Sequence, residues 1–498
     1  MAAGAGTGQA GMTMASDEAR ALAATLRDLD GIVRILTCGS VDDGKSTLIG
    51  RLLWEASDLP EDTRQGLIRQ AGPDGIPDVS LLLDGLVAER EQGITIDIAW
   101  RYFDAGRRRF VVIDSPGHEQ YTRNMASGAS HADIAIMLVD ARHGVKRQTR
   151  RHAAILDLVG VKRVVVAVNK MDLIDWSQSR FEEIAADFAT ITERFAFEEA
   201  VALPVSAKLG DNVAGRSAHT PWYAGETLLE IIDRAPSRII ESGSAFRFPV
   251  QTVLRGGTDF RGLAGTVASG VVRVGDPVFD GLSRRQANVR RIATMDGDLE
   301  QASAGQAVVV QLDTDLDVAR GAVLSSPDAV PVVARAIEAR LVWLADSPLD
   351  ASHGLLLRTA TDLVPLSSIA IRARLDLETL QETAVSSCST NDIVIADLSL
   401  AQAVAVDRFA DNREMGAFVL VDALTGATLA GGVIVTAAAR SASEGNDAFV
   451  LTNEMLARGV CAGLASSDPE FRRRAQEVAI ILRAAGVTVA RDKGPGES

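Results

Sequence analysis

The stretch Gly39-Ser40-Val41-Asp42-Asp43-Gly44-Lys45-Ser46 decides the fold of this 498-residue chain. It fits the pattern GxxxxGK[ST], between an apolar strand expected at 32–38 and a helix expected at 46–53. In that context the loop amides and the helix N-terminus surround phosphates. We therefore predict a phosphate site, in which Lys45 also acts in catalysis and Ser46 holds Mg²⁺. It comprises Gly39, Ser40, Val41, Asp42, Asp43, Gly44, Lys45, Ser46 and Thr47.

A second motif, Asp114-Ser115-Pro116-Gly117, ends an expected strand at 110–114 about 70 residues after the loop. A carboxylate there faces the phosphate loop across the sheet edge. We expect Asp114 to hold Mg²⁺, and Gly117 to offer its amide to the γ-phosphate. His118 follows directly and would orient the attacking water, since phosphoryl transfer depends mainly on positioning and electrostatics.

A threonine lies between these motifs, in Gly93-Ile94-Thr95-Ile96-Asp97. We predict that Thr95 closes over the metal when the γ-phosphate is present. Taken alone, the same five residues would also suit an ordinary turn before a strand.

The third motif, Asn169-Lys170-Met171-Asp172, follows an apolar strand expected at 164–168. Asp172 would accept hydrogen bonds from guanine N1 and N2, a donor pair that adenine lacks. Asn169 would join this loop to the phosphate loop and to the base, and the stem of Lys170 would cover the base. Backbone amides of Ser206-Ala207-Lys208, after the next strand, would meet guanine O6. Together the motifs predict a GTPase.

Strands and helices alternate from 32 to 233, which favours an α/β P-loop domain with a parallel sheet. Short strands separated by turn signals then predict two β-barrels. A short α-helical remnant follows. The expected domains are a flexible extension at 1–30, the GTPase domain at 31–240, β-barrels at 245–328 and 331–437, and a tail at 448–498.

Composition narrows the functional classes. The formal net charge is −15, whereas proteins that grip nucleic acid backbones usually present a positive surface. We expect no nucleic acid partner. No apolar run suits a membrane span or a signal peptide, so no membrane partner and a cytoplasmic location are expected. Cys38, Cys388 and Cys461 are widely spaced, which favours small buried thiols over a zinc site or a disulfide framework.

Beyond these motifs, the chain resembles translational GTPases, and more closely the GTPase (large) subunit of bacterial ATP sulfurylase, sulfate adenylyltransferase. The resemblance spans about 32–437. It rests on the segments 37–50, 89–97 and 114–125, on Gly210-Asp211-Asn212 and Pro221-Trp222-Tyr223, and on Asp259-Phe260-Arg261-Gly262, Ala268-Ser269-Gly270, Gly305-Gln306-Ala307-Val308, Asp411-Asn412-Arg413 and Gly416-Ala417-Phe418.

There are departures from the family pattern. The family commonly has SALKGDN where this chain has SAKLGDN at 206–212, and the stretch 60–80 is rich in Pro and Gly. An elongation factor would more typically have GHVDHGKT and GHADY. This chain instead has Ser40, Asp43 and Glu119-Gln120-Tyr121 at those places.

The resemblance implies that a partner, the catalytic small subunit, makes adenosine 5′-phosphosulfate and pyrophosphate from ATP and sulfate. GTP hydrolysis on this chain would drive or activate that uphill reaction in a hetero-oligomer for sulfate assimilation. The product would feed cysteine biosynthesis or a dedicated sulfation pathway. Two alternatives stay open: an elongation-factor-like GTPase, and a GTP-binding scaffold without catalytic output.

The tail resembles part of an adenylylsulfate kinase, through the segment 456–464 and an expected helix around 470–485. Such a kinase needs its own P-loop, and none occurs between Ala437 and Leu451. Thr452-Asn453-Glu454 replaces the family's Asp-Gly-Asp, and Ala457 replaces an arginine. We predict no kinase activity, and an unrelated helical tail is the alternative.

Overall fold

A computed structural model describes most of the chain. The described residues are 31–57, 59–71, 75–83, 97–106, 108–236, 244–256, 260–314, 316–350, 354–439, 449–451, 468, 470–471, 473–474, 476–478 and 489–491. The expected N-terminal extension, Thr95, Asp259, Cys461 and the kinase-like motifs at 452–464 lie outside them. The chain divides into two compact units, Met1–Ala438 and Ala439–Ser498.

The first part of the larger unit is a six-stranded sheet of order β2-β3-β1-β4-β5-β6. Five of its strands run parallel, as the sequence predicted: β1 (Ile32–Gly39), β3 (Arg108–Asp114), β4 (Ile134–Asp140), β5 (Arg163–Asn169) and β6 (Glu199–Pro204).

The edge strand β2 (Ala99–Ala105) was not predicted, and it runs antiparallel to β3. Only residues 106 and 107 separate the two strands, too few for the crossover that a parallel pair needs.

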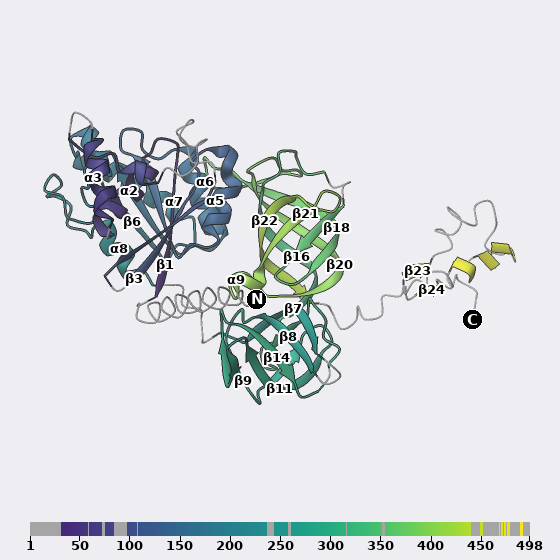
Figure 1. Cartoon of the computed structure of the whole chain (residues 1–498). Coiled ribbons are helices and arrows are strands. Elements are labelled where there is room, and N and C mark those ends of the chain that lie inside the picture. The colour runs from purple at the N-terminus through teal and green to yellow at the C-terminus, as the bar shows by residue number, and fades with distance from the viewer. Residues whose placement is uncertain are drawn as a thin grey trace, which may run out of the picture. The chain divides into compact units, whose positions relative to one another are not determined.

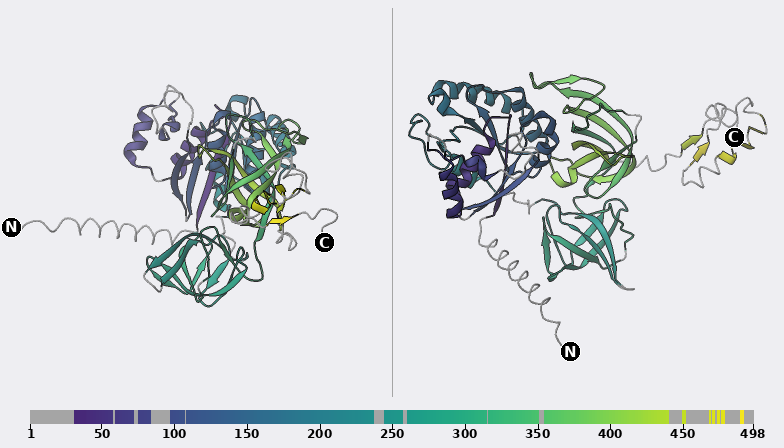
Figure 2. Two further views of the ribbon diagram at one scale, coloured as in Figure 1. Left: turned by 90° about the vertical axis from the view of Figure 1, so that its right-hand side faces the viewer. Right: turned by 45° about the horizontal axis from the view of Figure 1, so that its top comes forward.

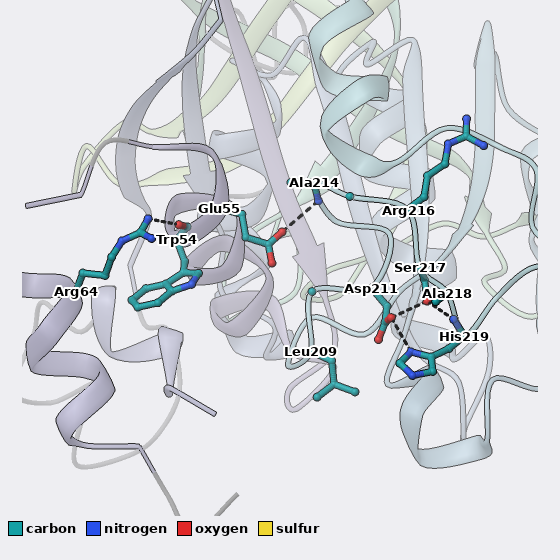
Figure 3. Close-up of a pocket in the computed structure, with 12 residues that line it drawn as sticks. Trp54, Glu55, Arg64, Leu209, Asp211, Ala214, Arg216, Ser217, Ala218 and His219 are labelled. Carbon is teal, nitrogen blue, oxygen red and sulfur yellow. Dashed lines mark hydrogen bonds and ion pairs between the residues drawn. The ribbon is translucent and has the colours of Figure 1, made fainter. Parts of the chain in front are cut away.

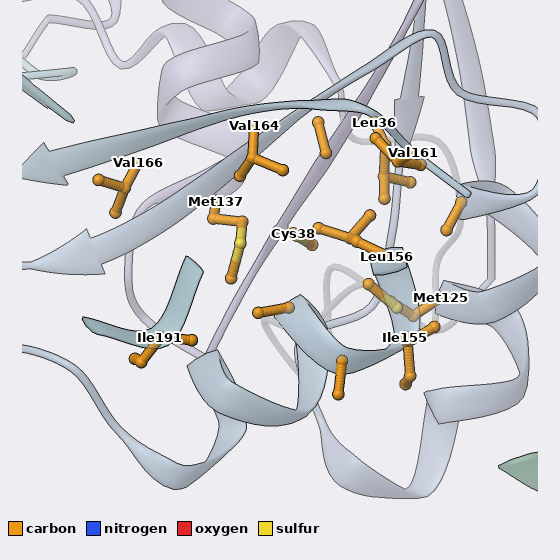
Figure 4. Close-up of a cluster of buried hydrophobic side chains, with 14 of the residues drawn as sticks. Leu36, Cys38, Met125, Met137, Ile155, Leu156, Val161, Val164, Val166 and Ile191 are labelled. Carbon is orange, nitrogen blue, oxygen red and sulfur yellow. The ribbon is translucent and has the colours of Figure 1, made fainter. Parts of the chain in front are cut away.

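Helices cover both faces of this sheet (Figure 1). On one face, α2 (Lys45–Ala56) and α8 (Leu228–Arg234) pack apolar side chains on the strands. On the other, α5 (Thr122–Ala129), α6 (Arg147–Leu158) and α7 (Gln178–Thr192) enclose a second apolar layer. Figure 4 shows part of that layer, in which Cys38 lies beside Met137 and Leu156.

The two cysteines among the described residues agree with the sequence prediction. Cys38 and Cys388 are buried free thiols, as expected, and burial raises the pKa of Cys38 to about 12.

The Pro- and Gly-rich stretch 60–80 is more regular than its composition suggests. Its described residues include helix α3 (Glu61–Arg69) and the 3₁₀ turn η1 (Val79–Leu82), and Pro60 lies just before α3, where its missing N–H removes no helical hydrogen bond.

Two closed six-stranded β-barrels follow, as predicted (Figure 2). Pairing of β10 with β11 closes the first and pairing of β17 with β18 closes the second. The first contains β7 (Arg247–Gly256), β8 (Phe260–Thr266), β10 (Pro277–Asp280), β11 (Arg285–Thr294), β14 (Ala307–Leu312) and β15 (Val323–Ser325). The second contains β16 (Val332–Trp343), β17 (Leu355–Arg358), β18 (Leu363–Leu375), β20 (Ile393–Val406), β21 (Ala417–Asp422) and β22 (Thr428–Ala439).

The smaller unit contains β23 (Phe449–Leu451), which pairs parallel to β24 (Val489–Arg491). Described residues between 470 and 478 are helical, where a helix was expected. Among the described residues, no helix combines the length and apolar character needed to cross a bilayer.

A buried ion pair joins the two barrels. Arg247 at the start of β7 donates from Nε and Nη2 to the two carboxylate oxygens of Asp407, at 2.8 and 3.1 Å. Its remaining nitrogen, Nη1, donates to the carbonyls of Phe246 and Ala329. Arg247 is 7% exposed and Asp407 9%, so solvent screens this pair weakly.

We predict that Asp407→Ala lowers the free energy of unfolding by about 3–5 kcal/mol, because it leaves a buried guanidinium without its counter-charge. Urea denaturation of the full chain measures this. Arg408→Ala is the matched control, since the Arg408–Asp411 pair is more than half exposed and should contribute under about 1 kcal/mol. Equal denaturation midpoints for the two variants would contradict the prediction.

Candidate functional site

The phosphate end of the site lies at the carboxyl edge of the parallel sheet. The register of β1 with β3 sets Thr37 opposite Asp114, and the phosphate loop leaves β1 directly afterwards. Thr37 Oγ1 donates to Asp114 Oδ1 at 3.3 Å, and Asp114 is only 4% exposed. Helix α2 then begins at Lys45, so Ser46 and Thr47 lie in its first turn.

Lys45 is buried within its own loop. Its Nζ donates to Gly39 O at 3.1 Å and to Ser40 O at 2.9 Å. Burial lowers the pKa of Lys45, while the nearby carboxylates of Asp114 and Asp43 act in the opposite direction. The ammonium therefore lies among anionic groups and carbonyl oxygens, in the loop predicted to hold phosphates.

Gly117 lies directly against the phosphate loop. A Cβ added there would be 2.7 Å from Gly39 O and would collide with Lys45 Nζ. No side chain fits at that position without displacing the loop. The segment 114–117 and the phosphate loop are thus in contact, as the motif spacing predicted.

Asp43 has a structural task that the sequence analysis did not assign. Its Oδ2 accepts from Ser40 N at 2.7 Å, and its Oδ1 accepts from Lys146 Nζ at 3.2 Å. The carboxylate, which is 2% exposed, therefore holds the turn of the loop. Lys146 precedes α6, and no sequence signal placed it here.

Asn169 joins the phosphate loop to the base-reading loops. Its Nδ2 donates to Asp43 O at 2.8 Å, and its Oδ1 accepts from Ala207 N at 2.9 Å. The predicted link to the phosphate loop is therefore present. The Ala207 amide, predicted to meet guanine O6, donates to Asn169 Oδ1.

Two other base-reading residues are bonded to each other, and a third reaches the phosphate loop. Ser206 Oγ donates to Asp172 Oδ1 at 2.7 Å, which orients the carboxylate assigned to guanine. Lys170, at φ 64°, donates to Asp42 O and lies 3.1 Å from Asp140 Oδ2. Lys170 therefore connects the base loop to the phosphate loop.

Asp140 was missed by the sequence analysis, although it ends β4 at the same sheet edge. Burial alone would raise its pKa, but hydrogen bonds from Arg142 and Lys170 outweigh burial and bring the pKa well below the usual range. Its negative charge fixes the Lys170 ammonium. The signal that could have found it is its place at the carboxyl end of a parallel strand.

His118 follows the Asp114 motif and begins the 3₁₀ turn η2 (Glu119–Tyr121). Its ring is exposed, and its Nδ1 accepts from Gln120 N at 3.3 Å. Glu119 is held by Arg151 of α6 at 2.8 Å, and Asn391 of the second barrel donates to Glu119 O at 3.1 Å. Neighbouring contacts therefore fix the backbone beside His118, whose exposed ring lies edge-on to the Tyr121 ring, with the ring centroids 6.1 Å apart.

A buried histidine, His152 on α6, lies close to this site and was not singled out in the sequence. It is 1% exposed, and its Nε2 lies 2.9 Å from Gln148 Nε2. Burial, reinforced by the positive charges of Lys45 and Arg151, lowers the pKa of His152 to about 3. Folding therefore keeps this imidazole neutral.

We predict that His152 makes the protein acid-sensitive. An unfolded histidine titrates near 6.5, so between that pH and about 3 the unfolded chain binds the extra proton. The free energy of unfolding should therefore decrease as the pH is lowered through this window, by about 2 kcal/mol between pH 6.5 and pH 5. The melting temperature of His152→Gln should fall less steeply from pH 7 to 5 than that of the unmodified chain. Parallel curves would contradict this.

Comparison with known proteins agrees with this geometry. Residues 30–237 match the elongation factor Tu GTP binding domain, and residues 336–435 match the GTP-eEF1A C-terminal domain-like family. Sulfate adenylyltransferase subunit 1 of Teredinibacter turnerae is 44% identical over 84% of this chain and 90% of its own length. The chain belongs to the sulfate adenylyltransferase subunit 1 family.

Other sulfate adenylyltransferase subunit 1 proteins match over a similar range. That of Cellvibrio japonicus is 45% identical over 81% of this chain and 86% of its own. The bifunctional enzyme NodQ of Rhizobium meliloti is 44% identical over 82% of this chain. The aligned part covers 64% of NodQ, just under two thirds of that protein. Membership of this family, with its GTP-binding domain, makes the chain a GTP-binding protein.

Proposed function

We propose that this chain is the GTP-hydrolysing subunit of a sulfate adenylyltransferase. It would couple GTP hydrolysis to the formation of adenosine 5′-phosphosulfate and pyrophosphate from ATP and sulfate on a partner catalytic subunit. Identity of 44% across 90% of a sulfate adenylyltransferase subunit 1 carries this proposal. The bonds of Asn169 to Asp43 and Ala207 support the GTP part, because they join the phosphate and base-reading loops into one site.

At the phosphate end, the amides of residues 39–44 and the first turn of α2 would surround the β- and γ-phosphates. The phosphate oxygens would take Lys45 Nζ from the carbonyls to which it now donates. Gly117 already lies against the phosphate loop, so its amide would be offered to the γ-phosphate.

The residues predicted to bind a metal suit Mg²⁺, which prefers hydroxyl, carboxylate and phosphate oxygens. Asp114 is a buried carboxylate beside the phosphate loop, and Ser46 lies in the first turn of α2. Ser46 and Asp114 would hold the ion with Thr95. When bound, Mg²⁺ neutralises charge on the phosphates.

At the base end, Asp172 would accept from guanine N1 and N2, with Ser206 holding its carboxylate. The Lys170 stem would cover the ring and the amides of residues 206–208 would approach O6. His118 would orient the attacking water, since its ring is exposed next to the segment that carries Gly117.

The domain limits are proposed as predicted: 1–30, 31–240, 245–328, 331–437 and 448–498. The gap between β15 and β16 supports the barrel boundary. We further propose that the last segment is a kinase-like remnant without kinase activity. Use of GTP and ATP, with free thiols at Cys38 and Cys388, favours the cytoplasm.

Reconstitution tests the function. We expect the purified chain to hydrolyse GTP, and GTP to stimulate adenosine 5′-phosphosulfate formation only when the catalytic subunit is added. His118→Ala should still bind GTP but lose about 100-fold or more in hydrolysis, the lower end of the usual scale for one positioned catalytic group. GTP stimulation of adenosine 5′-phosphosulfate formation should fall by the same factor as GTP hydrolysis. Absence of stimulation with the unmodified chain would overturn the proposal, and aminoacyl-tRNA binding would favour the elongation-factor alternative.

The base pocket has its own test. We predict that Asp172→Asn weakens GTP binding by at least about tenfold, because the amide replaces an acceptor with a donor opposite guanine N1 and N2. The variant should gain preference for xanthosine triphosphate, whose O2 accepts. Titration of both nucleotides measures this, and Asp175→Asn, three residues further along the same loop, is the control. An unchanged preference would mean that the base is bound elsewhere.

A further inference from the structure

A buried arginine of α2 holds the base-reading loop from behind. Arg51 is 6% exposed; its Nε donates to Ala207 O at 3.1 Å, and its Nη2 donates to Lys208 O. These are the residues after the last strand of the sheet whose amides are assigned to the base. Since α2 begins at Lys45, one helix carries both the phosphate lysine and this support.

Glu55, one helical turn further on, extends the support along the same loop. It pairs with Arg51 at 3.7 Å, and its Oε2 accepts from Ala214 N at 3.3 Å (Figure 3). Gly210, at φ +92°, lies so close that a Cβ would collide with Glu55 Oε1. Burial raises the pKa of Glu55, while the charge of Arg51 opposes that shift. The pair therefore contacts the loop at 207, 208 and 214.

Residues of this loop from Leu209 onward border an open cavity at the surface, on the side of α2 that carries Trp54 and Glu55. Its volume is about 630 Å³, and its lining includes Trp54, Glu55, Arg64, Leu209, Asp211 and His219. Figure 3 shows Leu209 and Asp211 on one side of this cavity, with Trp54 and Arg64 on the other. Ala207 itself is buried in the apolar core beside α2, so the polar bonds from α2 add to its packing, while residues further along the loop border the cavity.

We propose that Arg51 is a positioning residue for guanine selection, an inference that rests on the GTP site proposed above. Ala207 is held on two sides: its amide by Asn169 and its carbonyl by Arg51. Fixing both groups sets where the neighbouring amides face the base. Arg51 itself does not contact the nucleotide.

The proposal predicts different effects on the binding of GTP and on the binding of ATP. GTP binding uses the phosphate loop and the base-reading loop, whereas ATP, which lacks the guanine donor pair, relies on phosphate contacts. Loosening the loop at 207–208 should therefore weaken GTP and GDP while leaving weak ATP binding unchanged. It should also leave the hydrolysis step unchanged once GTP is saturating.

The experiment compares Arg51→Met with Arg51→Lys in the full chain, by titration with GTP, GDP and ATP. For Arg51→Met we expect GTP and GDP affinity to fall about tenfold or more, since two bonds from a charged group are lost. The KM for GTP should rise by the same factor, with kcat within twofold. Arg51→Lys should recover only part of the affinity, because an ammonium cannot reproduce the guanidinium fork.

Arg64→Met is the matched control. Arg64 borders the same cavity, but its Nη2 donates to Trp54 O and its guanidinium lies 4.8 Å from the Trp54 ring, so it does not hold the loop. Unchanged GTP affinity in a folded Arg51→Met chain, or equal losses for GTP and ATP, would overturn the inference. If the unmodified chain binds GTP but gives no stimulation with the catalytic subunit, the proposed function fails while the Arg51 result stands.

Discussion

The two hydrogen bonds of the Asn169 side chain are the constraint on which the rest of the site depends. One amide group reaches the phosphate loop through Asp43 O and the base-reading loop through Ala207 N. Asn169 is 2% exposed, so loss of either bond would leave a buried polar group unsatisfied, which costs about 1–3 kcal/mol. The separation of the two loops is thereby set before any nucleotide arrives.

Charged side chains near Asn169 also hold the loops of the site in place. Lys146 holds Asp43, and Lys170 connects Asp140 to the phosphate loop. Arg51 of α2 supports the base-reading loop through its bond to the Ala207 carbonyl. Each is a long side chain that reaches a loop from a neighbouring rigid helix or strand end. A site built in this way has little freedom to reorganise when it binds its ligand, which favours affinity.

The segment after the Asp114 motif has a different kind of support. Glu119 is bound by Arg151 of α6 and by Asn391 of the second barrel, and Arg123 donates to the barrel carbonyls of Leu344 and Thr428. Residues next to His118 therefore connect the GTPase domain to a barrel. A change in the backbone beside His118 would therefore alter the contacts between the GTPase domain and this barrel.

The sequence by itself determined the fold class, a P-loop domain with a parallel sheet followed by two β-barrels, and it located the three motifs that are predicted to bind the nucleotide. Those features depend on local patterns: an apolar strand, a glycine-rich turn and a helix start lie within a few residues of one another. Tertiary structure alone decided which residues from distant parts of the chain support these motifs. Arg51 and Ala207 are 156 positions apart, and Lys146 and Asp43 are 103 apart. No local pattern encodes such pairs, because only sheet register and helix packing bring them together. The neutral state of the buried His152 was likewise decided by the environment into which the chain folds.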